Sequence, residues 1–393
     1  MKALLPIFLI VTVDILGLTI VLPLLPFYAE HYGASPTVVG WLVTAFALCQ
    51  LISGPILGSL SDRTGRKPML IVSQIGTLIG FLILAFANSL FWVFLARIID
   101  GFTAGNLSVA QAYIADNTEP KDRAKSFAVI GIAFGLGFLI GPAISGYLSQ
   151  FGYSTPIFAA AGLSALSVLA TTFLLPSKEK SATASDAELP AGRRLGLLNW
   201  AIYRDYFRNP SLAPLLFQFL CFCLSFSIFI SGFALFAERR FTIGGKPWGP
   251  KEVGYAYAYA GLLGILIQGG AIRRLVPRFG ERALAISGFL AFGIGYAILG
   301  FAYTLPLFIL STTIASYGSS VIRPTLTSLV TQAADRRDQG VVLGLTQSLN
   351  SISQITAPLL AGPLIQHGHL TIWALCASFM GLFGATLGFR FFF

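Results

Sequence analysis

The sequence predicts an all-α integral membrane protein with twelve transmembrane helices. Of its 393 residues 55% are hydrophobic and only 11% are charged, whereas an ordinary soluble domain carries about 25% charged residues, and the mean hydropathy is +0.77. The apolar runs are long enough to cross a bilayer as helices, which takes about 20 residues, and they lack the alternation of a membrane barrel strand. These observations exclude soluble domains, disorder, collagen-like sequence and a disulfide scaffold.

Charged and turn residues divide the chain into twelve apolar runs. They cover residues 4–28, 38–60, 69–87, 91–115, 127–150, 155–175, 211–237, 253–272, 283–302, 305–331, 341–365 and 370–389. The first run follows a single Lys and lacks a small-residue cleavage site, so we expect a membrane helix and not a removable signal peptide.

The one long polar connection predicts three parts. Residues 1–176 are expected to form an N-terminal six-helix bundle and residues 211–393 a C-terminal one. Between them, residues 177–210 are expected to be a cytoplasmic linker, whose first part has the composition of a flexible chain. Its later stretch, Leu195–Phe207, has the aromatic and basic pattern of an interfacial amphipathic helix.

Basic residues predict the orientation in the membrane. If the N-terminus is cytoplasmic, 20 of the 26 Lys and Arg residues fall on the cytoplasmic side, four fall on the opposite side and two lie within spans. This asymmetry follows the positive-inside rule and places both termini in the cytoplasm. The net charge of +10 is therefore a signal of topology, and we expect no nucleic-acid partner.

Three sequence segments recur at a nearly fixed offset. Residues 62–67 have a degraded counterpart at 278–282, 215 residues further on, and residues 141–146 match 357–362 at an offset of 216. The pair 122–123 matches 338–339 at the same offset. Repeats of this kind predict two pseudo-symmetric six-helix bundles around a central site.

The segment Gly58–Pro68 (GSLSDRTGRKP) is the most specific motif. It occupies the turn between the second and third spans, where Gly65 permits a tight turn and Gly58 permits close approach of a helix. Asp62, Arg63 and Arg66 can form a charge cluster there. The motif resembles the signature loop of the major facilitator superfamily, which implies that superfamily's fold of two six-helix bundles and transport by alternating access.

Further segments resemble the twelve-helix drug:proton antiporters of this superfamily, and the first half is most similar to the tetracycline-efflux branch. The segments are 16–26 in the first span, Arg97–Gly101 in the fourth, Ala112–Asp116 after it and Gly137–Gly146 in the fifth. The last copy departs from the antiporter motif, which usually has Gly where Ala128 and Ser145 stand. The second half also has no mid-membrane acid, whereas tetracycline pumps normally have one there.

The resemblance implies a conformational switch. Asp62 is expected to pair with the N-terminus of the eleventh span while Arg63 or Arg66 reaches Asp116. Gly137, Gly141 and Pro142 are expected to act in switching as well, although helix packing alone accounts equally well for the glycines. Pro142 interrupts the helical hydrogen-bond ladder.

Charged residues within spans are candidates for proton coupling and substrate binding, because each costs roughly 2.5–3.5 kcal/mol at the centre of a membrane helix. Asp14 is the leading candidate, as a proton carrier or as a permanent ion pair with Arg97 or Arg323. Arg97 and Asp100 share a helical face and form either a structural pair or a proton relay. Arg323 either attracts an anionic or zwitterionic substrate or neutralises Asp14.

Polar and aromatic residues near membrane depth complete the predicted substrate cavity. Together with Asp14 and Arg323 they are Gln50, Asn106, Gln111, Gln218, Gln268, Tyr317, Asn350 and Gln354. The cysteines and histidines show no metal-ligand spacing, and the chain has neither a phosphate-binding loop nor a nucleophile–base pair. We therefore expect no metal, no cofactor and no enzymatic activity.

The sequence thus predicts a proton-coupled secondary transporter that exports an amphiphilic organic solute or drug in exchange for protons. The alternative is a proton-coupled importer or exchanger of a small anionic metabolite, suggested by Arg323. The expected partners are a small-molecule substrate, protons and the lipid bilayer. The resemblance further implies a monomer in the inner membrane of a bacterium.

Overall fold

The computed structural model describes residues 5–116, 123–175, 204, 206–334 and 339–392. Its principal helices are α1 (Leu5–Val21), α2 (Leu25–His31), α3 (Pro36–Thr64), α4 (Arg66–Ala85), α5 (Leu90–Thr103), α6 (Asn106–Asp116), α7 (Arg123–Leu148), α8 (Ser154–Leu174), α10 (Ala213–Arg240), α11 (Pro250–Leu266), α12 (Ile272–Gly300), α13 (Leu305–Ala333), α14 (Gln339–Gln366) and α15 (Leu370–Phe392). Two short helices, η1 (Ser149–Phe151) and η2 (Ile267–Ala271), and a hairpin of β1 (Thr242–Ile243) and β2 (Lys246–Pro247) complete the described elements. The predicted all-α membrane fold is confirmed.

Each of the twelve predicted spans coincides with one helix or with adjacent helices. In the described part of the chain, nine helices are long and apolar enough to cross a membrane, or ten if the pair α1 and α2, bent by 42°, is one span. One of the nine is the continuous stretch Pro250–Gly300, which contains two predicted spans, and α14 is not among them. The predicted helix at Leu195–Phe207 lies mostly outside the described residues.

The chain divides into two compact units. Unit 1 comprises Met1–Ser181 and Ala237–Leu262, and unit 2 comprises Ala182–Phe236 and Leu263–Phe393. The hairpin and most of α11 therefore pack with the first half of the sequence. Glycine allows this packing. At Gly261 of α11, any larger residue would clash, because its Cβ would lie 2.6 Å from the carbonyl oxygen of Phe138 in α7. The predicted partition at the linker remains a prediction.

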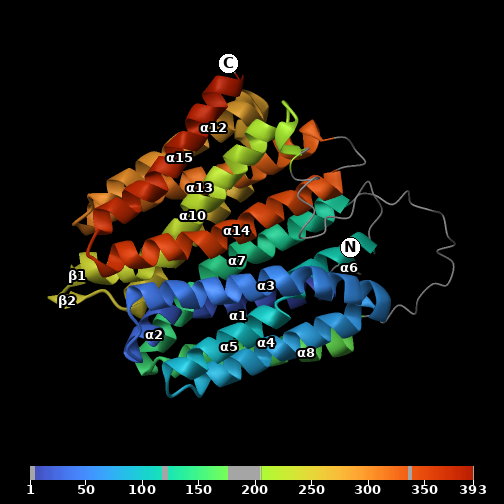
Figure 1. The fold of residues 1–393 in the computed structure, drawn as a ribbon, viewed down its shortest axis with the longest axis vertical. Coiled ribbons are helices and arrows are strands. Elements are labelled where there is room, and N and C mark those ends of the chain that lie inside the picture. Colours follow the sequence, from blue (N-terminus) through green and yellow to red (C-terminus); the bar gives the residue numbers. More distant parts are fainter. Residues whose placement is uncertain (1–4, 117–122, 176–203, 205, 335–338, 393) are drawn as a thin grey trace. The chain divides into compact units, whose positions relative to one another are not determined.

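In unit 1, α1 packs on α7 and α8, while α4 packs on α5 and α8 (Figure 1). A buried apolar cluster joins α1, α4, α6 and α7, with Ile10 of α1, Leu70 of α4 and Val109 of α6 among its members. Tyr28 of α2 is also buried, and its hydroxyl donates to the carbonyl of Leu84 at 3.0 Å. These contacts fix the surroundings of the charged residues in α1 and α5.

The fourth predicted span is broken into α5 and α6 at Ala104 and Gly105. Ser73 of α4 satisfies backbone groups at the break, because its hydroxyl donates to the carbonyl of Thr103 and accepts from the backbone N–H of Gly105. Irregular backbone at membrane depth needs such partners. The predicted single span at residues 91–115 is therefore two helices joined by a short break.

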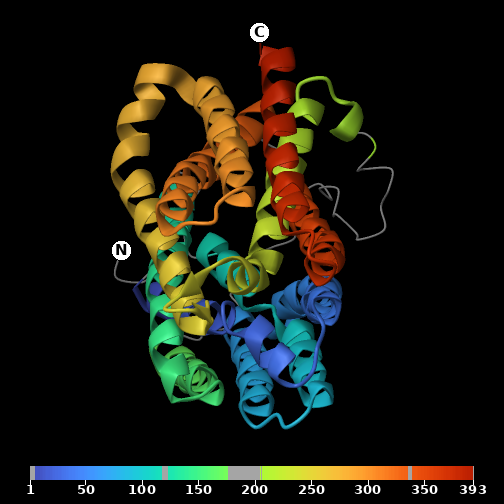
Figure 2. The same ribbon diagram turned by 90° about the vertical axis from the view of Figure 1, so that its left-hand side faces the viewer.

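In unit 2, α12 packs closely on α13 and α15 (Figure 2). Within α12 the backbone turns at Gly280, which has a φ of 76° and separates the two predicted spans. Gly65, 215 residues earlier, has a φ of 100° in the turn between α3 and α4. Only glycine adopts such angles without strain. The backbone conformation at these two glycines therefore repeats at the same offset as the sequence.

Candidate gate and proton-coupling site

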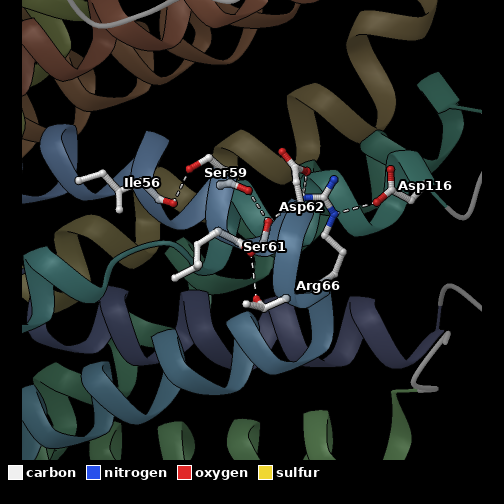
Figure 3. A network of polar contacts seen from close by, with 9 residues as sticks. Ile56, Ser59, Ser61, Asp62, Arg66 and Asp116 are labelled. Carbon is white, nitrogen blue, oxygen red and sulfur yellow. Dashed lines mark hydrogen bonds and ion pairs between the residues drawn. The ribbon is translucent and has the colours of Figure 1, made fainter. Parts of the chain in front are cut away.

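Arg66 is the centre of the charge cluster that the signature loop forms (Figure 3). Its guanidinium lies 2.6 Å from Asp62 and 2.7 Å from Asp116, and it also donates to the hydroxyl of Ser61 at 2.6 Å. Arg66 is only 20% exposed, whereas Asp62 and Asp116 are 61% and 52% exposed. A single arginine therefore links the ends of α3, α4 and α6.

The structure shows which of the two arginines of the motif contacts Asp116. Arg66 and not Arg63 contacts Asp116, and Arg63 is exposed. Gly65 forms the expected tight turn. At Gly58, however, a Cβ would meet no described atom within 4 Å, so the close helix approach expected there is absent from this part of the structure. The residues that precede α14 lie outside the described ranges, so the pairing of Asp62 with that helix remains a prediction.

Asp14 lies in the interior of α1 and is held by neutral side chains of two neighbouring helices. The amide nitrogen of Gln74 in α4 donates to its carboxyl at 3.2 Å, and the hydroxyl of Ser167 in α8 also forms a hydrogen bond with it. The same Gln74 nitrogen lies 2.8 Å from the Ser167 hydroxyl. No described basic residue forms an ion pair with Asp14. Its charge can therefore be removed by protonation without leaving a cation unpaired.

Arg97 and Asp100 form a buried ion pair within α5. The N–O distance is 2.8 Å, and their side chains are only 6% and 7% exposed. Asp100 has a further hydrogen bond from Thr77 of α4, and the Arg97 guanidinium lies 4.1 Å from the centre of the Phe46 ring. Arg97 is therefore engaged by Asp100 and not by Asp14.

The predicted switch glycines of α7 lie against α1 beside Asp14. A Cβ at Gly137 would overlap Ile15, and one at Gly141 would overlap Thr19. The Thr19 hydroxyl donates to the carbonyl of Gly137 at 2.9 Å. The motif thus creates close contact between α7 and α1.

Pro142 lies where α7 meets α11. A Cβ at Gly254 of α11 would overlap the carbonyl oxygen of Pro142, and it would lie 2.9 Å from the Cα of Gly146. The segment that resembles the antiporter motif therefore also packs closely against α11. These contacts are those of helix packing, and a role of Pro142 in switching remains a prediction.

The predicted binding residues of unit 2 differ in their surroundings. Arg323 of α13 is exposed. Tyr317 forms a hydrogen bond of 3.1 Å with Ser287 of α12. Gln218 is fully buried and donates to the carbonyl of Gly384 at 3.0 Å, so it occupies a contact between α10 and α15.

The other predicted cavity residues are partly buried or exposed. Gln50, Asn106, Asn350 and Gln354 are of intermediate exposure, and Gln111 is exposed. The side-chain amide oxygen of Asn106 is buried with no hydrogen-bond partner in the described structure. A substrate role for these residues remains a prediction.

The sequence did not point to Gln74, Ser167 and Thr77, the residues that contact Asp14 and Asp100. Each is a polar residue within an apolar run, and that was the available signal. Single hydroxyls and amides are common in membrane helices, where they bond to neighbouring helices. Only the packing of α4 against α5 and α8 shows which of them contact a carboxyl group.

The model of the Major Facilitator Superfamily matches residues 7–277 and 271–393. The chain is 32% identical over 365 residues to the class C tetracycline resistance protein of Escherichia coli, covering 89% of this chain and 86% of that protein. It is 30% identical over 371 residues to the class B protein of the same organism, with coverage of 93% and 88%. The quinolone resistance protein NorA of Staphylococcus aureus (strain COL) is 27% identical over 350 residues, with coverage of 89% and 86%.

Solved transporter structures share the fold over the full chain. The human organic anion transporter MFSD10 (TETRAN) superposes with a TM-score of 0.73 at 23% identity, covering 98% of this chain and 99% of that one. The nucleoside transporter NupG superposes with a TM-score of 0.74 at 16% identity, covering 100% of this chain and 98% of that one.

Proposed function

Because this chain belongs to the major facilitator superfamily, whose members are transporters and not enzymes, we propose that it exports amphiphilic organic solutes or drugs in exchange for protons by alternating access. Its relatives at about 30% identity are bacterial tetracycline resistance proteins, and NorA carries quinolone resistance. The tetracycline and quinolone resistance of these relatives supports export of an organic solute.

The observation that carries proton coupling is the environment of Asp14. Gln74 and Ser167 hydrogen bond to its carboxyl, and no described cation pairs with it. Asp14 is partly buried, and a carboxylate shielded from water is costly unless it is paired, so gain or loss of one proton changes the stability of this site. Because Asp14 lies beside Ile15, which packs against Gly137, such a change acts directly where α1 meets α7.

The cluster of Arg66, Asp62 and Asp116 supplies the proposed gate. Its acids are more than half exposed, and exposed ion pairs contribute only about 0–1 kcal/mol. Contacts of that size can form and break in every transport cycle. In our proposal, they stabilise one end state and release when the protein switches.

We further propose a monomer in a bacterial inner membrane with both termini in the cytoplasm. The bacterial relatives support the source, and the 20 basic residues on one side against four on the other support the orientation.

Reconstitution into liposomes that contain a pH-sensitive dye tests the proposal. Under an imposed proton gradient, a solute panel of lipophilic cations, zwitterions and organic anions should produce solute-dependent proton movement in wild-type protein. Asp14→Asn should abolish this movement while Asp14→Glu retains part of it, because only the latter can carry the proton. Uphill transport by Asp14→Asn at the wild-type rate would refute the role of Asp14.

A further inference from the structure

One face of α13 is polar along much of the helix. Ser316, Ser320, Arg323 and Thr327 recur at intervals of four, three and four residues, which places them on one side of an α-helix. The side that packs on α12 is different and carries Ala315, Gly318 and Ile322. A Cβ at Gly288 of α12 would lie 2.8 Å from Ile322, and one at Gly295 would lie 2.7 Å from the backbone of Ala315. The polar face is therefore turned away from α12.

Arg323 forms no ion pair with an acidic residue in the described part of the structure. It is the single charged residue within the six predicted spans between residues 211 and 389. The described acid nearest to it along unit 2, Glu281, instead accepts hydrogen bonds from Ser328 at 2.7 Å and Gln332 at 2.9 Å. Because an Arg within the bilayer is costly, such residues face a bundle interior or a water-filled cavity and mark substrate pathways.

The surroundings of Arg323 contain groups that suit a polar ligand. On α11, a Cβ at Gly264 would lie 3.6 Å from the Ser320 hydroxyl. Four residues further on, Gln268 lies in the π-helical η2, which packs on α13. Short π-helical insertions often occur at functional sites.

Gln268 is exposed, and its amide has no hydrogen-bond partner among the described residues. Gln268 lies about one helical turn after Gly264, and Arg323 lies about one helical turn after Ser320. The two exposed side chains therefore come from corresponding levels of neighbouring helices. An exposed guanidinium and an unpaired amide donor together match the oxygens of a carboxylate.

We propose that Arg323 and Gln268 bind the carboxylate of an organic anion, so that the transported solute is an amphiphile with a negatively charged group. This inference rests on the proposed transport function and specifies its substrate class. Arg323 supplies the charge and Gln268 a neutral hydrogen bond. The resulting charge compensation removes the cost of the unpaired cation when substrate is bound.

Equilibrium binding to the purified full chain tests the proposal independently of transport. Benzoate and naphthalene-2-carboxylate are titrated by calorimetry, each against its uncharged carboxamide and against benzyltrimethylammonium. We expect wild-type protein to bind the carboxylates at least about tenfold more tightly than the amides, which corresponds to about 1.4 kcal/mol. Arg323→Gln should abolish this preference, Arg323→Lys should retain part of it, and Gln268→Leu should weaken it.

Arg390→Gln is the matched control, because it removes the same charge from the same unit and should leave the preference unchanged. Solute-driven proton flux of the wild-type protein is measured beside the titrations, so a failure of proton coupling and a failure of carboxylate binding are seen separately. Equal binding of carboxylates and amides by wild-type protein would overturn the inference. So would a carboxylate preference that survives in Arg323→Gln, or competition by phosphate and chloride that accounts for all anion binding.

Discussion

Arg66 donates to Asp116 across 2.7 Å, and the second half of the chain repeats this contact with different chemistry. Glu281 and Gln332 stand 215 and 216 residues further on, and the Gln332 amide donates to Glu281 at 2.9 Å. The repeat therefore preserves the contact between the two helix ends but replaces an ion pair by a hydrogen bond between a charged and a neutral group. Of these two described contacts, the one in the first copy is the ion pair, and salt weakens exposed ion pairs.

Arg66→Gln should slow transport far more than Arg63→Gln. Arg66 contacts Asp62, Asp116 and Ser61, whereas Arg63 is exposed. If these contacts stabilise one end state by about 1 kcal/mol, their loss changes the balance of states about fivefold. Turnover in proteoliposomes and melting temperature in detergent are the measurements, and the melting temperature should change little because the pairs are exposed. Equal turnover in the two variants would contradict the assignment of the gate to Arg66.

Much of the fold could be predicted from the sequence, because apolar length and the distribution of Lys and Arg are physical consequences of the bilayer. All twelve predicted spans coincide with helices. The break between α5 and α6 was missed because it depends on Ser73, a residue of another helix, which satisfies the freed backbone groups. Sequence spacing cannot show such a partner.

The charged residues of the candidate site could be predicted from the sequence, but the neutral residues that hydrogen bond to them could not. The resemblance implied that Arg63 or Arg66 reaches Asp116, and Arg66 makes this contact. Helical spacing placed Arg97 and Asp100 on one face, and they form an ion pair. The alternative pairing of Asp14 with Arg97 is not formed, because Asp100 engages Arg97 within the same helix. The neutral ligand of Asp14, Gln74, is 60 residues away in sequence, so local patterns contain no information about that contact.

Gly141→Ala should destabilise the packing of α1 on α7. The added Cβ would overlap the Thr19 side chain, and overpacking of this kind costs about 1–3 kcal/mol. Gly131→Ala is the matched control on the same helix, since its Cβ would meet nothing within 4 Å. Thermal unfolding in detergent should show a loss for Gly141→Ala alone, and adding Thr19→Ala should restore part of it. Identical melting of the two glycine variants would refute close packing at Gly141.

The Arg97–Asp100 pair can be tested as a structural or a relay element by comparing single and double variants. Asp100→Leu leaves Arg97 buried and unpaired, which costs about 3–5 kcal/mol. The double variant Arg97→Met and Asp100→Leu removes both charges, so it should be more stable than the single variant. If the pair is purely structural, the folded double variant should still couple transport to protons. Folding without coupling would instead identify a relay.

Gln74→Leu should shift the pH dependence of proton-coupled transport to higher pH. The Gln74 amide donates to Asp14 at 3.2 Å, and a hydrogen bond of this kind favours the carboxylate over the acid. Without it, the protonated form persists to higher pH, so proton release requires a more alkaline medium. Among the helices that neighbour α1, α8 carries no charged residue. The charged residues of α4, α6 and α7 all lie in the terminal turns of these helices: Arg66, Lys67, Asp116, Arg123 and Lys125. No described cation near Asp14 would compensate for the lost amide.

Ser164→Ala provides the control for this last variant. Its hydroxyl donates to the backbone carbonyl of Gln74 at 3.3 Å and is buried at the same contact between α4 and α8. Loss of packing alone would therefore affect both variants, through lower melting temperature and lower maximal rate at every pH. Solute-driven proton flux measured over a series of pH values should show the displaced profile in Gln74→Leu alone. A profile that keeps its wild-type midpoint in Gln74→Leu would mean that the amide only packs against α8, and that Ser167 by itself sets the protonation of Asp14.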